Sequence, residues 1–408
     1  MRSDKFFSKK TSPLITAVSL IVVAALVVAA GSFAGRLPAR DQEEFFSPNE
    51  PLYDGIIEIW LTETFVPGKG SHLRWLINSA ARFEKKYKGT LINIKEVAPD
   101  IARQLIAEGA DLPDAIICSG GVLSGAEYLR ELNSEAAKGV LPAFSQAVSL
   151  DGKLYGLPVS AGAYTILYNS RRIESAGIEG PVTAQSLGLL HLDSLPGKKR
   201  GVSYAIGCAQ ASYQAYSAAL MSMINISEVD ITAFPPDILT VDAKFAWADF
   251  VLEEKSAAYV CTQKEVFRIR QLEAGGNAFP WTAHKAPCEY TDQLLSLHFF
   301  GSVTDKNSAE KNAAMMLFAE ILLSEERQKA LADIGAFSVL DGFELIYPEE
   351  SAVHFMELGL KSPNLKVPGM LLWSESMAQI SEAEKNKNDA AQRLAAVNTS
   401  LENLGILE

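Results

Sequence analysis

The chain has 408 residues, of which 48% are hydrophobic and 21% charged, so it is long enough for about two domains with buried cores. This composition excludes a mostly disordered protein and a small protein held together by disulfides. The 37 basic and 49 acidic residues give a net charge of −12. That charge argues against nucleic acid as a partner, because phosphate contacts need a basic surface.

The N-terminus carries a basic segment, residues 1–13, followed by a long apolar run, residues 14–34. The apolar run contains no charged residue, and about 20 apolar residues suffice to cross a bilayer as a helix. Because basic residues favour the cytoplasmic side, the chain after this run is predicted to be exported. Two interpretations stay open, a retained transmembrane signal anchor and a cleaved signal peptide. In both, residues 35–54 form a polar tether.

The cysteines are few and form no CxxC pair; they are Cys118, Cys208, Cys261 and Cys288. An exported chain can carry disulfides, so a Cys261–Cys288 bridge stays open. The apolar neighbours of Cys118 favour a buried thiol instead. Only His284 stands near Cys288, which is too few ligands for a zinc site. The sequence therefore predicts no metal and no cofactor.

The exported chain begins with strands and helices in alternation. Apolar runs and helical periodicity predict strands at 56–61, 91–97 and 115–118, with helices at 73–88 and 101–108 between them. Such strand–helix–strand units form a mostly parallel sheet with helices on both faces. The fold class is therefore α/β.

Polar and aromatic residues gather where the first and third of these strands end. Trp60, Glu63 and Thr64 close the first strand, and Ser119 and Gly120 follow the third. Ligands of open α/β sheets bind beyond the carboxyl ends of the strands. These five residues are therefore predicted ligand contacts that supply an aromatic ring, a carboxylate, hydroxyls and main-chain amides.

The remainder of the chain becomes more helical toward its end. Asp151-Gly152 predicts a hairpin turn, and residues 164–168 are rich in β-forming residues. Helical periodicity then predicts a series of helices. They are 212–224, 242–255, 264–274, 310–323, 324–335, 371–383 and 389–404.

Sequence motifs of catalysis are missing. The chain has no P-loop, no GxGxxG, no HExxH and no GxSxG, and its five histidines are scattered. Paired carboxylates of a glycosidase stay open, because such residues are distant in sequence. The pattern favours binding over catalysis, and no catalytic residue is assigned.

Four stretches resemble the family 1 extracellular solute-binding proteins of ABC transporters. They are FEKKY at 83–87, DGKLYGLP at 151–158, LLSEERQ at 322–328 and the terminal helix at 390–401. The second stretch is the most specific of the four. Together they span most of residues 55–404.

The resemblance implies a two-lobed clamshell of the periplasmic-binding-protein type II fold that closes around its ligand. Lobe 1 is expected at 55–165 and about 282–330, and lobe 2 at 166–281 and about 331–408. Further ligand contacts are implied for Tyr164, Tyr213 and Trp281. The family includes many sugar binders, so the resemblance implies a sugar or oligosaccharide as the ligand. Aromatic rings stack on sugars, while carboxylates and amides bind their hydroxyls.

The function predicted from the sequence is that of a non-enzymatic subunit of an ABC importer. It captures a small ligand on the outer face of the bacterial cytoplasmic membrane, or as a secreted protein if the N-terminal segment is cleaved, and its partners are ABC permease subunits. No lipid-bearing cysteine follows the apolar run. That absence favours an alternative, a membrane-anchored sensing ectodomain that signals to a partner membrane protein. A secreted hydrolase is the third hypothesis.

Overall fold

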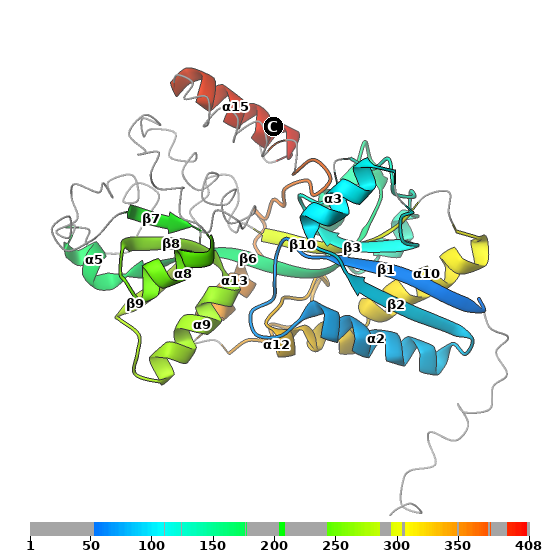
Figure 1. The fold of residues 1–408 in the computed structure, drawn as a ribbon, viewed down its shortest axis with the longest axis horizontal. Coiled ribbons are helices and arrows are strands. Elements are labelled where there is room, and N and C mark those ends of the chain that lie inside the picture. Colours follow the sequence, from blue (N-terminus) through cyan, green and yellow to red (C-terminus); the bar gives the residue numbers. More distant parts are fainter. Residues whose placement is uncertain are drawn as a thin grey trace, which may run out of the picture. The chain divides into compact units, whose positions relative to one another are not determined.

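The computed structural model (Figure 1) describes residues 53–109, 111–123, 125–175, 177, 204–208, 243–285, 295–303, 307–348, 351–373, 376 and 390–405. Several predictions fall outside these residues: the N-terminal basic segment and apolar run, the tether up to residue 52, the helix at 212–224 with Tyr213, most of the helix at 371–383, and Cys288. Within the described part of the chain, no helix combines the length and the apolar character that crossing a bilayer requires.

The first part of the sheet has the predicted parallel strands. β1 (Gly55–Thr62) lies between β2 (Thr90–Glu96) and β3 (Ala115–Ser119), and it pairs in parallel with both. Helices α2 (His72–Lys86) and α3 (Pro99–Ala107) connect these strands. The predicted strand–helix alternation is confirmed here.

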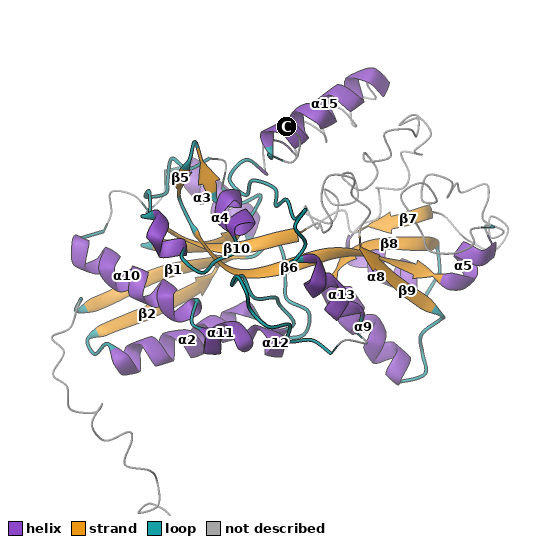
Figure 2. Ribbon diagram, turned by 180° about the vertical axis from the view of Figure 1, so that it is seen from behind, coloured by secondary structure: helices purple, strands orange, loops and turns teal. Residues whose placement is uncertain are grey.

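One long strand continues the sheet into a second group of strands. β6 (Leu157–Asn169) is 13 residues long, and every residue in it is buried. Its first half pairs with β10 (Leu295–Ser302), which also pairs with β3. Its second half pairs with β8 (Ser256–Thr262) and β9 (Trp281–Lys285), and Figure 2 shows β6 running from one strand group to the other.

The strand order of this sheet is β2-β1-β3-β10-β6-β8-β7, with β9 paired to β6 off that path and β7 (Tyr204–Cys208) parallel to β8. Strands β8 and β10 were not predicted from the sequence. All residues of both strands are buried, so neither shows the polar–apolar alternation that marks a half-exposed strand. The predicted lobe boundaries stay a prediction.

Shorter elements and helices complete the fold. They are η3 (Ser134–Ala137), α4 (Pro142–Ala147), β4 (Ser149–Leu150), β5 (Lys153–Leu154), α5 (Ser170–Ser175), α8 (Ala243–Val251), α9 (Gln263–Ala274), α10 (Ala309–Leu322), α11 (Glu325–Lys329), α12 (Leu331–Ile334), α13 (Ala352–Gly359) and α15 (Ala390–Asn403). The β4–β5 hairpin turns at Asp151 and Gly152, whose φ angles are 51° and 75°, as the Asp-Gly pair predicts. α9 begins directly after β8 because Thr262 caps it together with Glu265 in a capping box.

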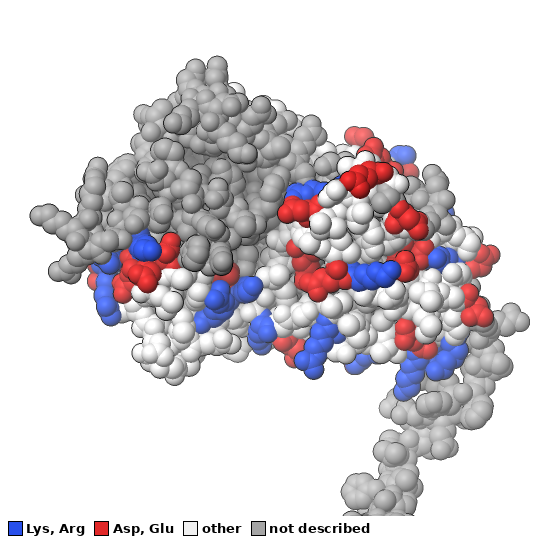
Figure 3. All heavy atoms as spheres, viewed as in Figure 1, with Lys and Arg blue, Asp and Glu red and all other residues white. Residues whose placement is uncertain are grey.

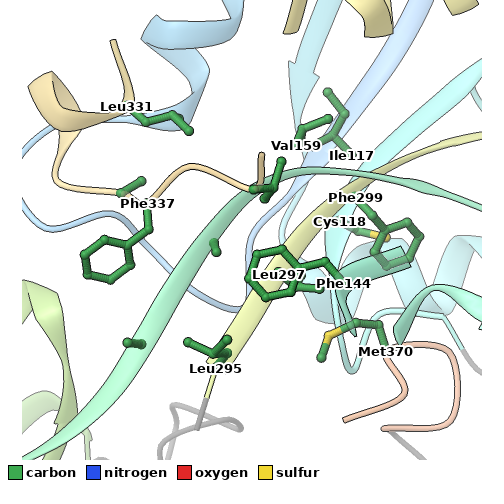
Figure 4. Packing of buried hydrophobic residues seen from close by; sticks show 14 of the residues in the cluster. Ile117, Cys118, Phe144, Val159, Leu295, Leu297, Phe299, Leu331, Phe337 and Met370 are labelled. Carbon is green, nitrogen blue, oxygen red and sulfur yellow. The ribbon is translucent and has the colours of Figure 1, made fainter. Parts of the chain in front are cut away.

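The core lies along the crossing strands. Figure 4 shows Val159 of β6 and Leu297 and Phe299 of β10 among buried side chains from other elements, including Cys118 of β3. Cys118 is fully buried with a free thiol, and burial raises the pKa of that thiol. The predicted buried thiol at this position is confirmed. Figure 3 shows acidic and basic side chains interspersed over one face, without a continuous basic area among the described residues there.

A buried glutamine fastens the LLSEERQ stretch to β6. The Gln328 amide nitrogen donates to the carbonyls of Val159 and Leu322, each at 2.9 Å. Its amide oxygen accepts from Ser338 Oγ at 2.9 Å and from the Val339 N–H at 3.0 Å. All four hydrogen-bonding positions of this fully buried amide are thus used.

Replacing Gln328 with Ala is expected to lower the free energy of unfolding by about 2–4 kcal/mol, because four buried polar groups lose their partner. Chemical denaturation followed by circular dichroism measures the change. The matched control is Gln271→Ala on α9, where the side chain is exposed, and its cost should stay below about 0.5 kcal/mol. Equal effects of the two substitutions would contradict the role given to Gln328.

Candidate ligand-binding site

The carboxyl ends of β1 and β3 meet at one edge of the sheet, as their parallel pairing requires. Thr64 Oγ1 lies 2.5 Å from Ser119 Oγ, and it donates to the Gly120 carbonyl at 3.0 Å. The Ser119 hydroxyl therefore donates to Thr64 Oγ1 and accepts from the Thr64 N–H at 3.2 Å. Three of the predicted ligand contacts thus form one hydrogen-bonded group at this edge.

An indole ring from the C-terminal part of the chain packs against this group. A methyl group on Gly120 would lie 3.0 Å from Met370 Sδ and 3.2 Å from Trp373 Cγ, so the main chain at Gly120 contacts both side chains closely. Trp373 is 2% exposed, and its indole N–H has no hydrogen-bond partner among the described residues. Trp373 is thus a core residue that the tertiary structure places beside a strand end.

Glu63 turns to the opposite side from Thr64, since successive side chains of an extended chain alternate. Its Oε1 lies 2.5 Å from His72 Nδ1 and 3.9 Å from His298 Nε2. The other ring nitrogen of His72, Nε2, is 3.0 Å from Ser160 Oγ. Glu63 therefore joins two buried histidines that the sequence had left as scattered residues.

Burial sets the charge state of these groups. It lowers the pKa of His72 and of His298 to about 3, so both imidazoles are neutral at physiological pH. Burial also raises the pKa of Glu63, against the attraction of His298 and Lys264. The cluster is therefore a low-dielectric site with two neutral imidazoles and one carboxyl group.

Phe65 covers this cluster from the side of the crossing strand. Its ring centroid lies 5.4 Å from that of His298 and 6.3 Å from that of His72. A methyl group on Gly162 of β6 would lie only 1.6 Å from Phe65 Cζ. Only glycine at position 162 therefore leaves room for the ring where it packs.

The loop after Phe65 is fixed to two other parts of the molecule. The N–H groups of Gly68 and Lys69 donate to the carbonyls of Gly335 and Ile334, at 3.0 and 2.9 Å. A methyl group on Gly68 would lie 2.2 Å from the Phe267 ring of α9. This loop therefore connects the strand-end edge of β1 with α9, which follows β8 of the second strand group.

The remaining predicted contacts lie elsewhere. The side chain of Trp60 is 8% exposed and belongs to the core, together with residues of α3 such as Ile106. Tyr164 is 1% exposed and pairs with Thr262 where β6 changes partners. Trp281 pairs with Asn169, at the end of β6 farther from β10. The structure therefore brings Glu63, Thr64, Ser119 and Gly120 to one edge, and it places Trp281 away from that edge.

A cavity of ≈ 330 Å³ lies away from these strand ends. Its walls come from the start of α4, the segment 338–345 and the chain around the end of α13. None of the predicted ligand contacts lines it. We assign the candidate site to the strand-end edge because the direction of parallel strands places ligands there.

A comparison with protein families supplies the identity of the fold. The sequence model of one protein family, the bacterial extracellular solute-binding proteins, matches residues 78–354. The chain belongs to this family. The resemblance inferred from the sequence is thereby confirmed, and the matched range contains the stretches at 83–87, 151–158 and 322–328. This solute-binding protein is accordingly extracytoplasmic and non-enzymatic. A comparison with curated proteins gives no significant match.

Solved structures share the fold of this solute-binding protein at low sequence identity. The GacH receptor of Streptomyces glaucescens, solved unliganded and with acarbose, is 14% identical, with a TM-score of 0.58 over 87% of this chain and 100% of the receptor. A chitin oligosaccharide binding protein is 14% identical, with a TM-score of 0.59 over 86% and 99%. An ABC transporter solute-binding protein of Agrobacterium vitis with bound D-mannitol is 16% identical, with a TM-score of 0.51 over 86% and 98%. These matches establish the α/β periplasmic-binding-protein fold.

Substitution Gly162→Ala is expected to destabilise the protein by about 3 kcal/mol, because the added methyl group displaces Phe65. The double variant Gly162→Ala, Phe65→Ala should cost less than the sum of the single variants, since the methyl group then meets no ring. Thermal unfolding and denaturant titration of all three variants measure this coupling.

The control for that series is Gly369→Ala, where an added methyl group meets nothing closer than a carbonyl oxygen at 3.7 Å. This variant should unfold within about 1 kcal/mol of the parent. Additive costs at positions 65 and 162 would show that the ring and the glycine do not depend on each other.

Proposed function

We propose that this solute-binding protein captures a sugar or oligosaccharide at the carboxyl edge of β1 and β3 and delivers it to an ABC importer. The observation that carries the proposal is the hydrogen-bonded group of Thr64, Ser119 and Gly120 at that edge. Clustered hydroxyls and main-chain carbonyls match the donor and acceptor pattern of a sugar. Family membership and proteins of the same fold that hold acarbose, chitin oligosaccharide or D-mannitol support this ligand class.

Trp373 is 2% exposed and packs against Gly120, so it supports the main chain of this edge from the core side. Glu63 is 11% exposed at the side chain and borders the same edge. Tyr213 stays a prediction as a further contact. Trp60, Tyr164 and Trp281 carry less support, because the first two are buried and the third is distant from the edge.

Ligand capture in this fold shifts an equilibrium between an open and a closed conformation. A ligand that contacts both lobes binds the closed state more tightly and therefore shifts the population toward it. Strand β6 is the described connection between the two strand groups, so such a motion would bend it. The closed form then presents a distinct surface to permease subunits.

The N-terminal sequence supports a second candidate, a sensing ectodomain. The uncharged run at 14–34 is followed by no cysteine for lipid attachment, so a retained helix would anchor the protein in the bilayer. The same closure would then signal to a partner membrane protein. Affinity purification after cross-linking distinguishes the two: co-purified permease subunits support import, and a co-purified receptor kinase supports sensing.

The ligand class is tested by thermal shift and calorimetry on the full-length chain in mild detergent. Mono- and oligosaccharides, sugar alcohols, amino acids and polyamines form the panel. A ligand at 100 times its Kd adds about 2.7 kcal/mol to the stability of the folded state, so a sugar that binds should raise Tm clearly. A shift from amino acids or polyamines alone would overturn the carbohydrate assignment.

The residues of the site are tested by Ser119→Ala. This substitution removes the two hydrogen bonds between the Ser119 hydroxyl and Thr64 and so loosens Thr64, and affinity for the bound sugar should fall about 10-fold, equivalent to about 1.4 kcal/mol. Ser175→Ala is the matched control, because that exposed hydroxyl bonds only within α5. Unchanged sugar affinity in Ser119→Ala would place the ligand away from this edge.

A further inference from the structure

Three side chains outside the hydroxyl group of Thr64, Ser119 and Gly120 converge inside the first half of the sheet. Glu63 follows β1, His72 is the first residue of α2, and His298 lies in β10. One donor atom of each lies within 4.8 Å of those of the other two. We propose that Glu63, His72 and His298 bind a divalent first-row transition metal ion, with Zn²⁺ as the best match.

The donor set fits this class of ion. Two imidazole nitrogens and one carboxylate oxygen are a common ligand set for Zn²⁺, which leaves a fourth position for water. Around a tetrahedral Zn²⁺ with bonds of about 2.1 Å, donor atoms lie about 3.4 Å apart. The observed separations of Glu63 Oε1 from the two histidines, 2.5 and 3.9 Å, bracket that value. Small side-chain rotations are enough to reach it.

The surroundings of His72 resemble those of a metal ligand. A histidine that binds metal through Nδ1 keeps its proton on Nε2 and donates it to a neighbouring oxygen. In the structure, Nδ1 of His72 faces Glu63 while Nε2 lies 3.0 Å from Ser160 Oγ. Ser160 is itself fully buried in β6, so this contact fixes the orientation of the ring.

His298 supplies an independent observation that points to a ligand. Its side chain is fully buried, and although the Phe65 main chain lies near the ring, neither ring nitrogen makes a hydrogen bond of standard geometry among the described residues. Leaving buried polar nitrogens unsatisfied costs free energy, so such groups usually have an unseen partner. A metal ion bound by Nε2 would satisfy the nitrogen that already faces Glu63.

Electrostatics agree with a bound cation. A divalent cation would stabilise the ionised form of the largely buried Glu63 carboxylate. Phe65 covers the cluster and limits water around it. The ion would link the chain after β1 with α2 and β10.

The test uses the untagged full-length chain, purified in mild detergent, treated with a chelator and dialysed. ZnCl₂ alone is titrated by calorimetry, and CoCl₂ alone by visible absorption, in the absence of sugar. We expect one equivalent of either metal, a Co²⁺ spectrum of four-coordinate nitrogen and oxygen ligation, and a higher Tm with Zn²⁺. Because no sugar is present, the outcome is independent of the proposed transport function.

Variants locate the ion. His298→Asn and Glu63→Gln each remove one ligand and should weaken Zn²⁺ binding at least about 100-fold, while Ser160→Ala should weaken it about 10- to 100-fold. The matched controls are His354→Asn and Glu357→Gln, which change a buried histidine and a buried glutamate of α13 outside the cluster. These controls should bind Zn²⁺ like the parent.

Three results would overturn the proposal: no stoichiometric Zn²⁺ binding, unchanged affinity in folded His298→Asn, or equal losses in the α13 controls. Circular dichroism checks that each variant is folded. If His298→Asn does not fold, Ser160→Ala decides, because it keeps all three ligands and alters only the support of His72. Parent-like Zn²⁺ affinity in Ser160→Ala would then reject the site.

Discussion

The fold depends on a single strand that belongs to two groups of strands at once. All 13 residues of β6 are buried, and its main-chain groups pair with β10 in one half and with β8 and β9 in the other. A charged residue anywhere along it would be desolvated without a partner, which explains its uncharged sequence. Because main-chain hydrogen bonds hold both halves, relative motion of the two groups is limited to bending and twisting of the crossing strands.

The features of the candidate site follow from this arrangement. Gly162 of β6 leaves space for Phe65, and Phe65 in turn covers His72 and His298. The extended chain after β1 then sends alternate side chains to opposite sides. Glu63 reaches the histidines and Thr64 reaches Ser119. One strand end thus contributes to two chemically different sites, a hydroxyl-rich edge and a buried nitrogen and oxygen cluster.

The loop that follows Phe65 links these sites to the second strand group. Its main chain bonds to Ile334 and Gly335, and Gly68 packs against Phe267 of α9. Gln328 fastens the neighbouring helix α11 to β6 through Val159. In this chain, Gln328 of the LLSEERQ stretch therefore supports the crossing strand.

The sequence by itself determined the local elements and predicted the strand-end edge as a ligand site. The helical periodicity of α2, the Asp151-Gly152 turn and the strand ends at Thr64 and Ser119 depend on neighbouring residues, and such short-range patterns are readable along the chain. The stretches at 151–158 and 322–328 also identified the family before any coordinates.

Only the tertiary structure decided which distant residues meet. β8 and β10 are buried on both faces and so lack alternation, His298 reaches Glu63 only through antiparallel pairing of β10 with β3, and Trp373 contacts Gly120 from the C-terminal part of the chain. The register of β9 against β6 sets Trp281 opposite Asn169, and its role as a ligand contact stays a prediction. Such contacts depend on register and packing between remote segments, which a single sequence does not encode in any local pattern.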